Sequence, residues 1–210
     1  MTEARGAASV EIELKFDVGE ETPLPDWTGL PGVARVDGPE RRNLDARYLD
    51  VADAALGRAG YALRRRSGGP DEGWHIKGPR RADGGRVETH WPLDDRDGVV
   101  VPDAVASAVS EIAPGTLTAL ARIRSARVAY ALTDADGRLI AEFVDDRVHA
   151  TDERRGTVST WREWEFELGP AAPADAAARV ALLDAATAAV ERAGGRVAAS
   201  DSKLARALGV

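Results

Sequence analysis

The stretch Val10-Glu11-Ile12-Glu13-Leu14-Lys15-Phe16 decides the fold class of this 210-residue chain. Apolar and charged residues alternate strictly along it, and a strand sends successive side chains to opposite faces. The stretch therefore predicts a strand with one apolar face and one face that carries Glu11, Glu13 and Lys15. On an ordinary half-buried strand such charges simply meet water, so any further meaning depends on the rest of the chain.

The same period of two returns along the sequence, which indicates strands rather than helices. Charged residues alternate with apolar ones around Arg64 and Arg66, Arg86 and Glu88, Glu142 and Asp146, and Glu163, Glu165 and Glu167. Strands are predicted near residues 9–17, 33–37, 43–50, 60–67, 73–78, 86–92, 124–134, 138–145 and 158–168, with a hairpin turn at 134–137. Helices are predicted at 51–59, 102–112, 173–193 and 201–208. Many strands with few helices favour an α+β fold built on a closed antiparallel barrel with helices packed outside.

The charged faces could point outward, where water would solvate them, or inward, where they would line a cavity with both signs. Charges removed from water are costly unless they are paired or bound to ions. Arginine forks suit phosphate oxygens, and clustered carboxylates suit a hard cation such as Mg²⁺ or Mn²⁺. A charged lumen therefore predicts a metal–polyphosphate ligand.

Length and composition set further bounds. The chain is expected to be one domain over residues 1–210, with a loose start at 1–8 and a terminal helix and tail at 200–210. A net charge of −7 argues against broad nucleic-acid or membrane-surface binding. The absence of cysteine excludes disulfides and thiolate chemistry. The start lacks the apolar core of a signal peptide, and no apolar run reaches membrane-spanning length, so a cytoplasmic location is expected.

The ordered set of motifs resembles the CYTH superfamily, also called triphosphate tunnel metalloenzymes. Glu11–Lys15 resembles the hallmark Glu-x-Glu-x-Lys of that family, and Leu63–Arg66 resembles its Leu-Arg-x-Arg strand. Further matches follow in family order at Tyr48–Asp50, Lys77, Arg86–Glu88, Glu142 with Asp146, Glu163–Glu167 and Ser202–Lys203. The resemblance covers nearly the whole chain and implies a closed eight-stranded antiparallel barrel.

The resemblance also implies roles for individual residues. The phosphate chain is expected to contact Lys15, Tyr48, Arg64, Arg66, Lys77, Arg86, Arg124, Arg127 and Lys203. Lys15, Arg64, Arg66 and Lys203 are expected to act in catalysis. Mg²⁺ or Mn²⁺ is expected to bind Glu11, Glu13, Glu88, Glu142, Asp146, Glu163 and Glu165. Strand parity with Glu142 favours Asp146 over Asp145, and Glu167, near a strand end, is expected to be solvated.

The function implied by the resemblance is metal-dependent hydrolysis of inorganic triphosphate or a related triphosphorylated compound. Several alternatives stay open. One is a class IV adenylate cyclase, another a thiamine triphosphatase, and a third a non-catalytic polyphosphate-binding module of the kind followed by a helical CHAD domain in a longer chain. A homodimer is also kept open. The plainest alternative is a stable β-rich scaffold whose charged faces point to solvent.

Overall fold

The computed structural model describes residues 6–93, 100–200 and 202–210. The loose start predicted for residues 1–5, the loop that Gly- and Asp-rich composition predicts at 94–98, and the helix start predicted at 201 lie outside this range. The strands are β1 (Ala7–Glu11), β2 (Glu13–Asp17), β3 (Arg35–Asp50), β4 (Ala62–Ser67), β5 (Gly73–Arg80), β6 (Arg86–Pro92), β7 (Thr118–Thr133), β8 (Leu139–Asp152), β9 (Thr157–Leu168) and β10 (Arg196–Val197). The helices are α1 (Ala55–Arg58), α2 (Asp103–Val109), α3 (Ala176–Ala193) and α4 (Lys203–Leu208).

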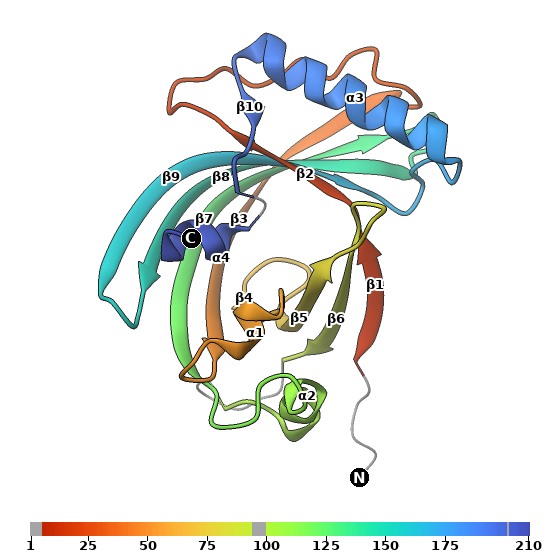
Figure 1. Ribbon diagram of the computed structural model, residues 1–210. Coiled ribbons are helices and arrows are strands. Elements are labelled where there is room, and N and C mark those ends of the chain that lie inside the picture. Colours follow the sequence, from red (N-terminus) through yellow and green to blue (C-terminus); the bar gives the residue numbers. More distant parts are fainter. Residues whose placement is uncertain (1–5, 94–99, 201) are drawn as a thin grey trace.

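All ten strands form one antiparallel-paired, strongly curled sheet in the order β1-β6-β5-β4-β3-β7-β8-β9-β2-β10 (Figure 1). The α+β class is confirmed, but a closed eight-stranded barrel is not, because the described strands run in an open order. The predicted first strand is interrupted at Ile12, so β1 pairs with β6 and β2 pairs with β9 at the other side of the sheet. The chain itself, rather than a hydrogen-bond ladder, joins the two sides at this residue.

The long central strands differ from the prediction mainly in length. The two segments expected at 33–37 and 43–50 form the single strand β3, and β7 begins at Thr118 instead of residue 124. The predicted hairpin joins β7 to β8. Asp134 accepts hydrogen bonds from the backbone N–H groups of Asp136 and Arg138, both at 2.9 Å, and Gly137 supplies a φ of 81°. The short β10 was not predicted.

The apolar core lies largely between the outer face of the sheet and the helices. One cluster packs α3 on the sheet through Leu182, Ala186 and Val190 against Phe143 and Trp164. The spacing of those helical residues, four and then four, places them on one face. Helix α3 thus covers the outside of the sheet, as expected and as Figure 1 shows, and its Val180 is exposed. A second cluster joins α1 and α2 to the outer faces of β3–β6.

Helix α4 lies on the concave side of the sheet (Figure 1). Ser202 caps its first turn by accepting a hydrogen bond from the Ala205 N–H at 3.3 Å. Leu204 and Ala207 bury themselves in a third apolar cluster with residues of β3, β7 and β8. This packing fixes Lys203, the first residue of the helix, against the interior. Within the described residues, no helix is long and apolar enough to cross a membrane.

Candidate functional site

The curled sheet encloses a cavity of about 310 Å³ that is lined by charges of both signs. The basic residues that line it are Lys15, Arg42, Arg64, Arg66, Lys77, Arg86, Arg127 and Lys203. The acidic residues that line it are Glu11, Glu13, Asp71, Glu142, Glu165 and Glu167. The charged faces therefore point inward, and the scaffold with outward charges is excluded for these strands.

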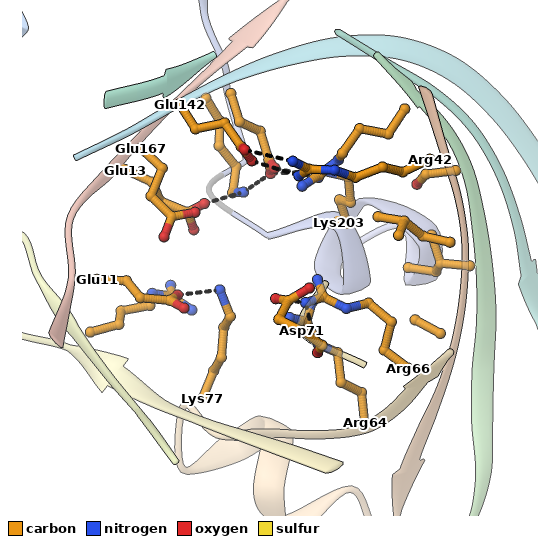
Figure 2. Close-up of a pocket in the computed structure, with 18 of the residues that line it drawn as sticks. Glu11, Glu13, Arg42, Arg64, Arg66, Asp71, Lys77, Glu142, Glu167 and Lys203 are labelled. Carbon is orange, nitrogen blue, oxygen red and sulfur yellow. Dashed lines mark hydrogen bonds and ion pairs between the residues drawn. The ribbon is translucent and has the colours of Figure 1, made fainter. Parts of the chain in front are cut away.

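The two signs are unevenly distributed around the cavity (Figure 2). Glu11, Glu13 and Glu167 approach together at one side of the cavity, because β2 pairs with β9 and the chain runs directly from β1 into β2. Arg64 and Arg66 approach from β4 on the opposite side. The cavity thus offers a carboxylate wall and a guanidinium wall that face one another.

The guanidinium wall is crowded with positive charge. Burial and the neighbouring Arg64 and Arg127 lower the pKa of Arg66 to about 9. The Nε groups of Arg64 and Arg66 are buried donors that have no hydrogen-bond partner in the described part of the chain. Buried polar groups are normally satisfied, so both side chains are suited to donate a hydrogen bond to an anionic oxygen. Arg64 reaches a carboxylate only at 3.4 Å, from Nη2 to Glu88.

Glu165 lies at the centre of a network of bases. Its carboxylate contacts the ammonium groups of Lys15 and Lys203, the latter at 2.6 Å, and the Arg127 guanidinium at 2.8 Å. Burial raises the pKa of Glu165, but the three cations outweigh burial and hold the pKa well below its usual range. Burial likewise lowers the pKa of Lys203, and Glu165, Asp146 and Glu163 reverse this, so the pKa is raised well above its usual value. These groups stay charged at neutral pH.

Three of the predicted metal ligands lie behind the cavity wall instead of lining it. Glu88, Asp146 and Glu163 are at most 4% exposed, and each is engaged with bases. Asp146 contacts Arg127 and Lys203, Glu163 contacts Lys203, and Glu88 contacts Arg64, Lys77 and His75. Alternation along a strand indicates which face a residue lies on but not how deeply it is buried. In this structure they hold and orient the bases that line the cavity.

Arg124 lies on the wrong side of the sheet for the role expected of it. Its side chain is exposed, while its neighbours Ile123 and Ser125 line the cavity. Alternation then brings Arg127, not Arg124, to the inner face. The preference for Asp146 over Asp145 is consistent with the structure, because Asp145 pairs with Arg162 and Trp164 instead.

Three charged residues at the cavity were not assigned a site role from sequence. Arg42 lines it from β3 and forms two hydrogen bonds of 3.0 Å to Glu142. Extending the alternation back from Tyr48 by six residues would have found it. Asp71 comes from the β4–β5 loop, which has no periodic signal. Glu167, expected to be solvated, is half-buried and lines the cavity, so that prediction is wrong.

The carboxylate wall fits a divalent cation by its chemistry. Burial, together with Glu11, Glu13 and Glu165, raises the pKa of Glu167 to about 7, and the pKa of Glu11 is raised by burial and by Glu88. Crowded carboxylates with raised pKa values are groups that a hard cation would stabilise in their ionised form. The described residues contain no preformed cluster of three or more metal-ligating side chains. Lys15 and Lys77 lie among these acids, bonded to Glu13 at 2.9 Å and Glu11 at 2.6 Å.

The fold and the site define a class of protein with a curled antiparallel sheet around a cavity lined by arginine, lysine and glutamate. The chain belongs to the CYTH domain family, which matches residues 9–188. It is 35% identical over 215 aligned positions to two Mycobacterium tuberculosis proteins, the uncharacterized proteins MT2285 of strain CDC 1551 / Oshkosh and Rv2226 of strain H37Rv. The match covers 98% of this chain but 41% of each relative, so the chain spans about two fifths of their length.

Solved structures share the fold. A proposed adenylate cyclase from Bacillus halodurans aligns with a TM-score of 0.64 at 18% identity, covering 95% of this chain and 97% of that chain. A proposed adenylyl cyclase from Hippeastrum, described as having a dominant triphosphatase activity, aligns with a TM-score of 0.54 at 14% identity, covering 95% of each chain. At such identities the likeness concerns the fold, not the reaction.

Proposed function

We propose that this protein hydrolyses inorganic triphosphate, or a closely related triphosphorylated compound, with the help of Mg²⁺ or Mn²⁺. The observation that supports this most strongly is the opposition of the two walls. Arg64 and Arg66, whose buried Nε donors have no hydrogen-bond partner among the described residues, face the carboxylates of Glu11, Glu13 and Glu167 across a small cavity. A chain of phosphates bound to a divalent cation matches both walls at once.

In this proposal the bases bind the phosphate oxygens and offset charge that develops as the anhydride bond breaks. Lys203 keeps its proton because its pKa is raised, so it stabilises charge on the departing phosphate instead of donating a proton. Asp146 and Glu163 hold Lys203 in place. The metal would bind at Glu11 and Glu13 and supply a Lewis acid for the phosphate oxygens.

Proton removal from the attacking water falls to the carboxylate wall. A general base works best with a pKa near the working pH. Glu167, with a pKa raised to about 7, meets this condition, whereas Glu165, held ionised by three cations, is a weak base. We infer that Glu165 organises the bases and that Glu167 is the acid–base group of the wall.

The lining of the cavity favours a compact phosphate ligand over a nucleotide. Among the described lining residues Tyr48 is the one aromatic side chain. It is 6% exposed and belongs to the third apolar cluster, which includes Leu204 and Ala207 of α4. A nucleobase is commonly held by stacking on an aromatic face. The adenylate cyclase alternative therefore lacks the platform that ATP would use within this part of the chain.

The test is phosphate release from inorganic triphosphate, thiamine triphosphate and ATP, each with Mg²⁺, Mn²⁺ or a chelator. Metal-dependent release of orthophosphate, fastest from inorganic triphosphate, is expected. Pyrophosphate released from ATP without orthophosphate would replace this proposal with the cyclase. Tight triphosphate binding without any turnover would replace it with a polyphosphate-binding module.

The variant Glu165→Gln distinguishes an enzyme from a binding module more clearly than the release assay does. The amide keeps the shape of the side chain but removes the charge that orders three cations. Turnover is expected to fall by about 100-fold, while triphosphate affinity is kept or increased because positive charge is freed. A loss of affinity without a loss of turnover would contradict this assignment.

The longer relatives leave room for a further domain, and we keep a CHAD domain as the proposed neighbour in such chains. A polyphosphate carried by a basic neighbour would suit the proposed chemistry of this cavity. The rate of phosphate release by the present chain can be measured with polyphosphates of increasing length. These rates are the baseline for a longer chain that carries a second domain.

A further inference from the structure

The β4–β5 loop places an acid of the protein itself on the guanidinium wall. The loop carries Asp71, whose carboxylate pairs with the Arg66 guanidinium inside the cavity (Figure 2). Arg66 also donates a hydrogen bond to the Asp71 carbonyl oxygen at 3.3 Å. The two partners differ in exposure, because the side chain of Arg66 is 7% exposed and that of Asp71 is 60% exposed.

The backbone of the loop is anchored, although the Asp71 side chain is not buried. His75 contacts the Asp71 carbonyl oxygen through Nε2 at 3.0 Å, and His90 contacts the Glu72 carbonyl oxygen at 3.1 Å. The Glu72 carboxylate accepts a hydrogen bond from the Gly68 N–H at 3.1 Å. The Asp71 carboxylate can therefore leave Arg66 by side-chain rotation alone, without movement of the loop.

Among the described residues, Asp71 is the carboxylate paired with Arg66, and other bases on this side have different partners. Arg64 and Lys77 share Glu88, and Arg127 is held by Asp146 and Glu165. Those counterions are buried side chains of strands, whereas the Asp71 side chain is exposed. Arg66 thus has an exchangeable counterion, and its Nε has no hydrogen-bond partner in the described part of the chain even when Asp71 is paired.

We propose that Asp71 is a built-in competitor that occupies the phosphate position of Arg66 in the empty cavity and returns to it when product leaves. A carboxylate is a weaker, singly charged mimic of a phosphate group, so a phosphate chain with contacts elsewhere displaces it. A short product, which has lost those other contacts, is displaced by it in turn. This inference rests on the proposed function, because it takes the cavity to be a phosphate site.

The competitor lowers affinity for every phosphate ligand that reaches Arg66. A substrate present above its dissociation constant tolerates this, whereas a product that must leave benefits from it. Asp71 therefore lowers the affinity of the cavity for phosphate ligands and thereby helps the product to leave. It is a residue that tunes binding and takes no part in bond breaking.

The test compares Asp71→Asn with Glu72→Gln, its neighbour. Both variants remove one negative charge from the same loop, but the described contacts of Glu72 are with Gly68 and His90, and glutamine keeps the acceptor for the Gly68 N–H. The probes are inorganic triphosphate, pyrophosphate and orthophosphate, titrated calorimetrically into metal-free protein. Asp71→Asn is expected to bind triphosphate about five- to tenfold more tightly than the unmodified protein, with Glu72→Gln unchanged.

Steady-state kinetics gives the second readout. Asp71→Asn is expected to show a lower KM and stronger inhibition by added orthophosphate, in proportion to its tighter binding. Equal affinity of Asp71→Asn and the unmodified protein, weaker binding by Asp71→Asn, or an equal gain in Glu72→Gln would each overturn the inference. If the unmodified protein bound no phosphate ligand at all, the proposed function itself would fail, and the two failures are thus distinguishable.

Discussion

Arg127 and Asp146 face each other across the β7–β8 ladder and form a two-point ion pair, from Nε to Oδ1 at 2.8 Å and from Nη2 to Oδ2 at 2.7 Å. Asp146 is fully buried, whereas Arg127 lines the cavity. The acid thus fixes the plane of the guanidinium from behind. A fork held in one plane loses less rotational freedom when it binds a phosphate.

Arg127→Gln is expected to weaken triphosphate binding by about 10- to 100-fold, since a charge-assisted contact is worth roughly 1.5–3 kcal/mol. Calorimetric titration of triphosphate measures the loss. Arg124→Gln is the matched control, because Arg124 lies on the same strand with its side chain exposed on the outer face. An equal loss in both variants would mean that the general positive field, not the inner face of β7, binds the ligand.

Asp146→Asn is expected to lower the free energy of unfolding by about 2–4 kcal/mol, because it leaves two buried cations, Arg127 and Lys203, short of a counterion. Urea denaturation measures the change. Asp146→Leu combined with Arg127→Leu is the control, since it removes one of the two cations together with the acid, and the other, Lys203, keeps Glu163 and Glu165 as partners. The double variant is expected to recover stability without recovering triphosphate binding, and an equally unstable double variant would point to packing instead of charge.

Glu167 predicts a pH dependence of stability in metal-free protein. Its folded pKa of about 7 lies above the ordinary value of 4.5, so between these values the folded chain holds a proton that the unfolded chain has lost. The stabilisation from this group is complete below pH 4.5 and disappears as the pH rises through 7. Glu167→Gln removes this slope and is expected to gain about 2–3 kcal/mol over the unmodified protein between pH 4 and pH 8.

Denaturation in chelator across that pH range measures the difference. Glu111→Gln, at an exposed position, is the control and is expected to follow the unmodified protein. Parallel curves for Glu167→Gln and the unmodified protein would show that Glu167 titrates normally and does not belong to a crowded carboxylate wall.

Glu11→Gln and Glu13→Gln are expected to weaken Mn²⁺ binding by about tenfold or more, because each removes a hard oxygen ligand and a negative charge from the wall. Electron paramagnetic resonance of free Mn²⁺ measures affinity, and turnover is expected to return in part at high metal concentration. Glu153→Gln, an exposed acid between β8 and β9, is the control. Unchanged Mn²⁺ affinity in both wall variants would place the ion elsewhere.

The inner face of the sheet could be predicted because alternation is a local property of the chain. Alternation in the sequence predicts that Glu11, Glu13 and Lys15 share one face, and it predicts the same for Arg64 and Arg66. Arg42 was not predicted as a residue of the site because the strand was expected to begin at residue 43. Arg124 was assigned with Arg127 although the two are three residues apart and must face opposite ways on a regular strand.

Depth and loops could not be predicted in the same way. Alternation places Glu88, Asp146 and Glu163 on the inner face, but their distance behind the lining bases depends on side-chain packing between strands far apart in sequence. Asp71 comes from a loop, where no period exists. The open order of the sheet depends on the interruption at Ile12, which looks like any other apolar residue of a continuous strand.

The apolar packing under the outer helices and the charged lining of the cavity are separate parts of the sheet, and this separation has an evolutionary consequence. Apolar clusters under α1, α2 and α3 supply the burial that keeps the chain folded, while the charges that would meet a ligand line the concave side. A substitution in the lining can therefore alter what is bound without removing the packing that holds the strands together. Substitutions in a few interior side chains can thus change which ligand such a scaffold binds, while the apolar packing on its outer side keeps the fold stable.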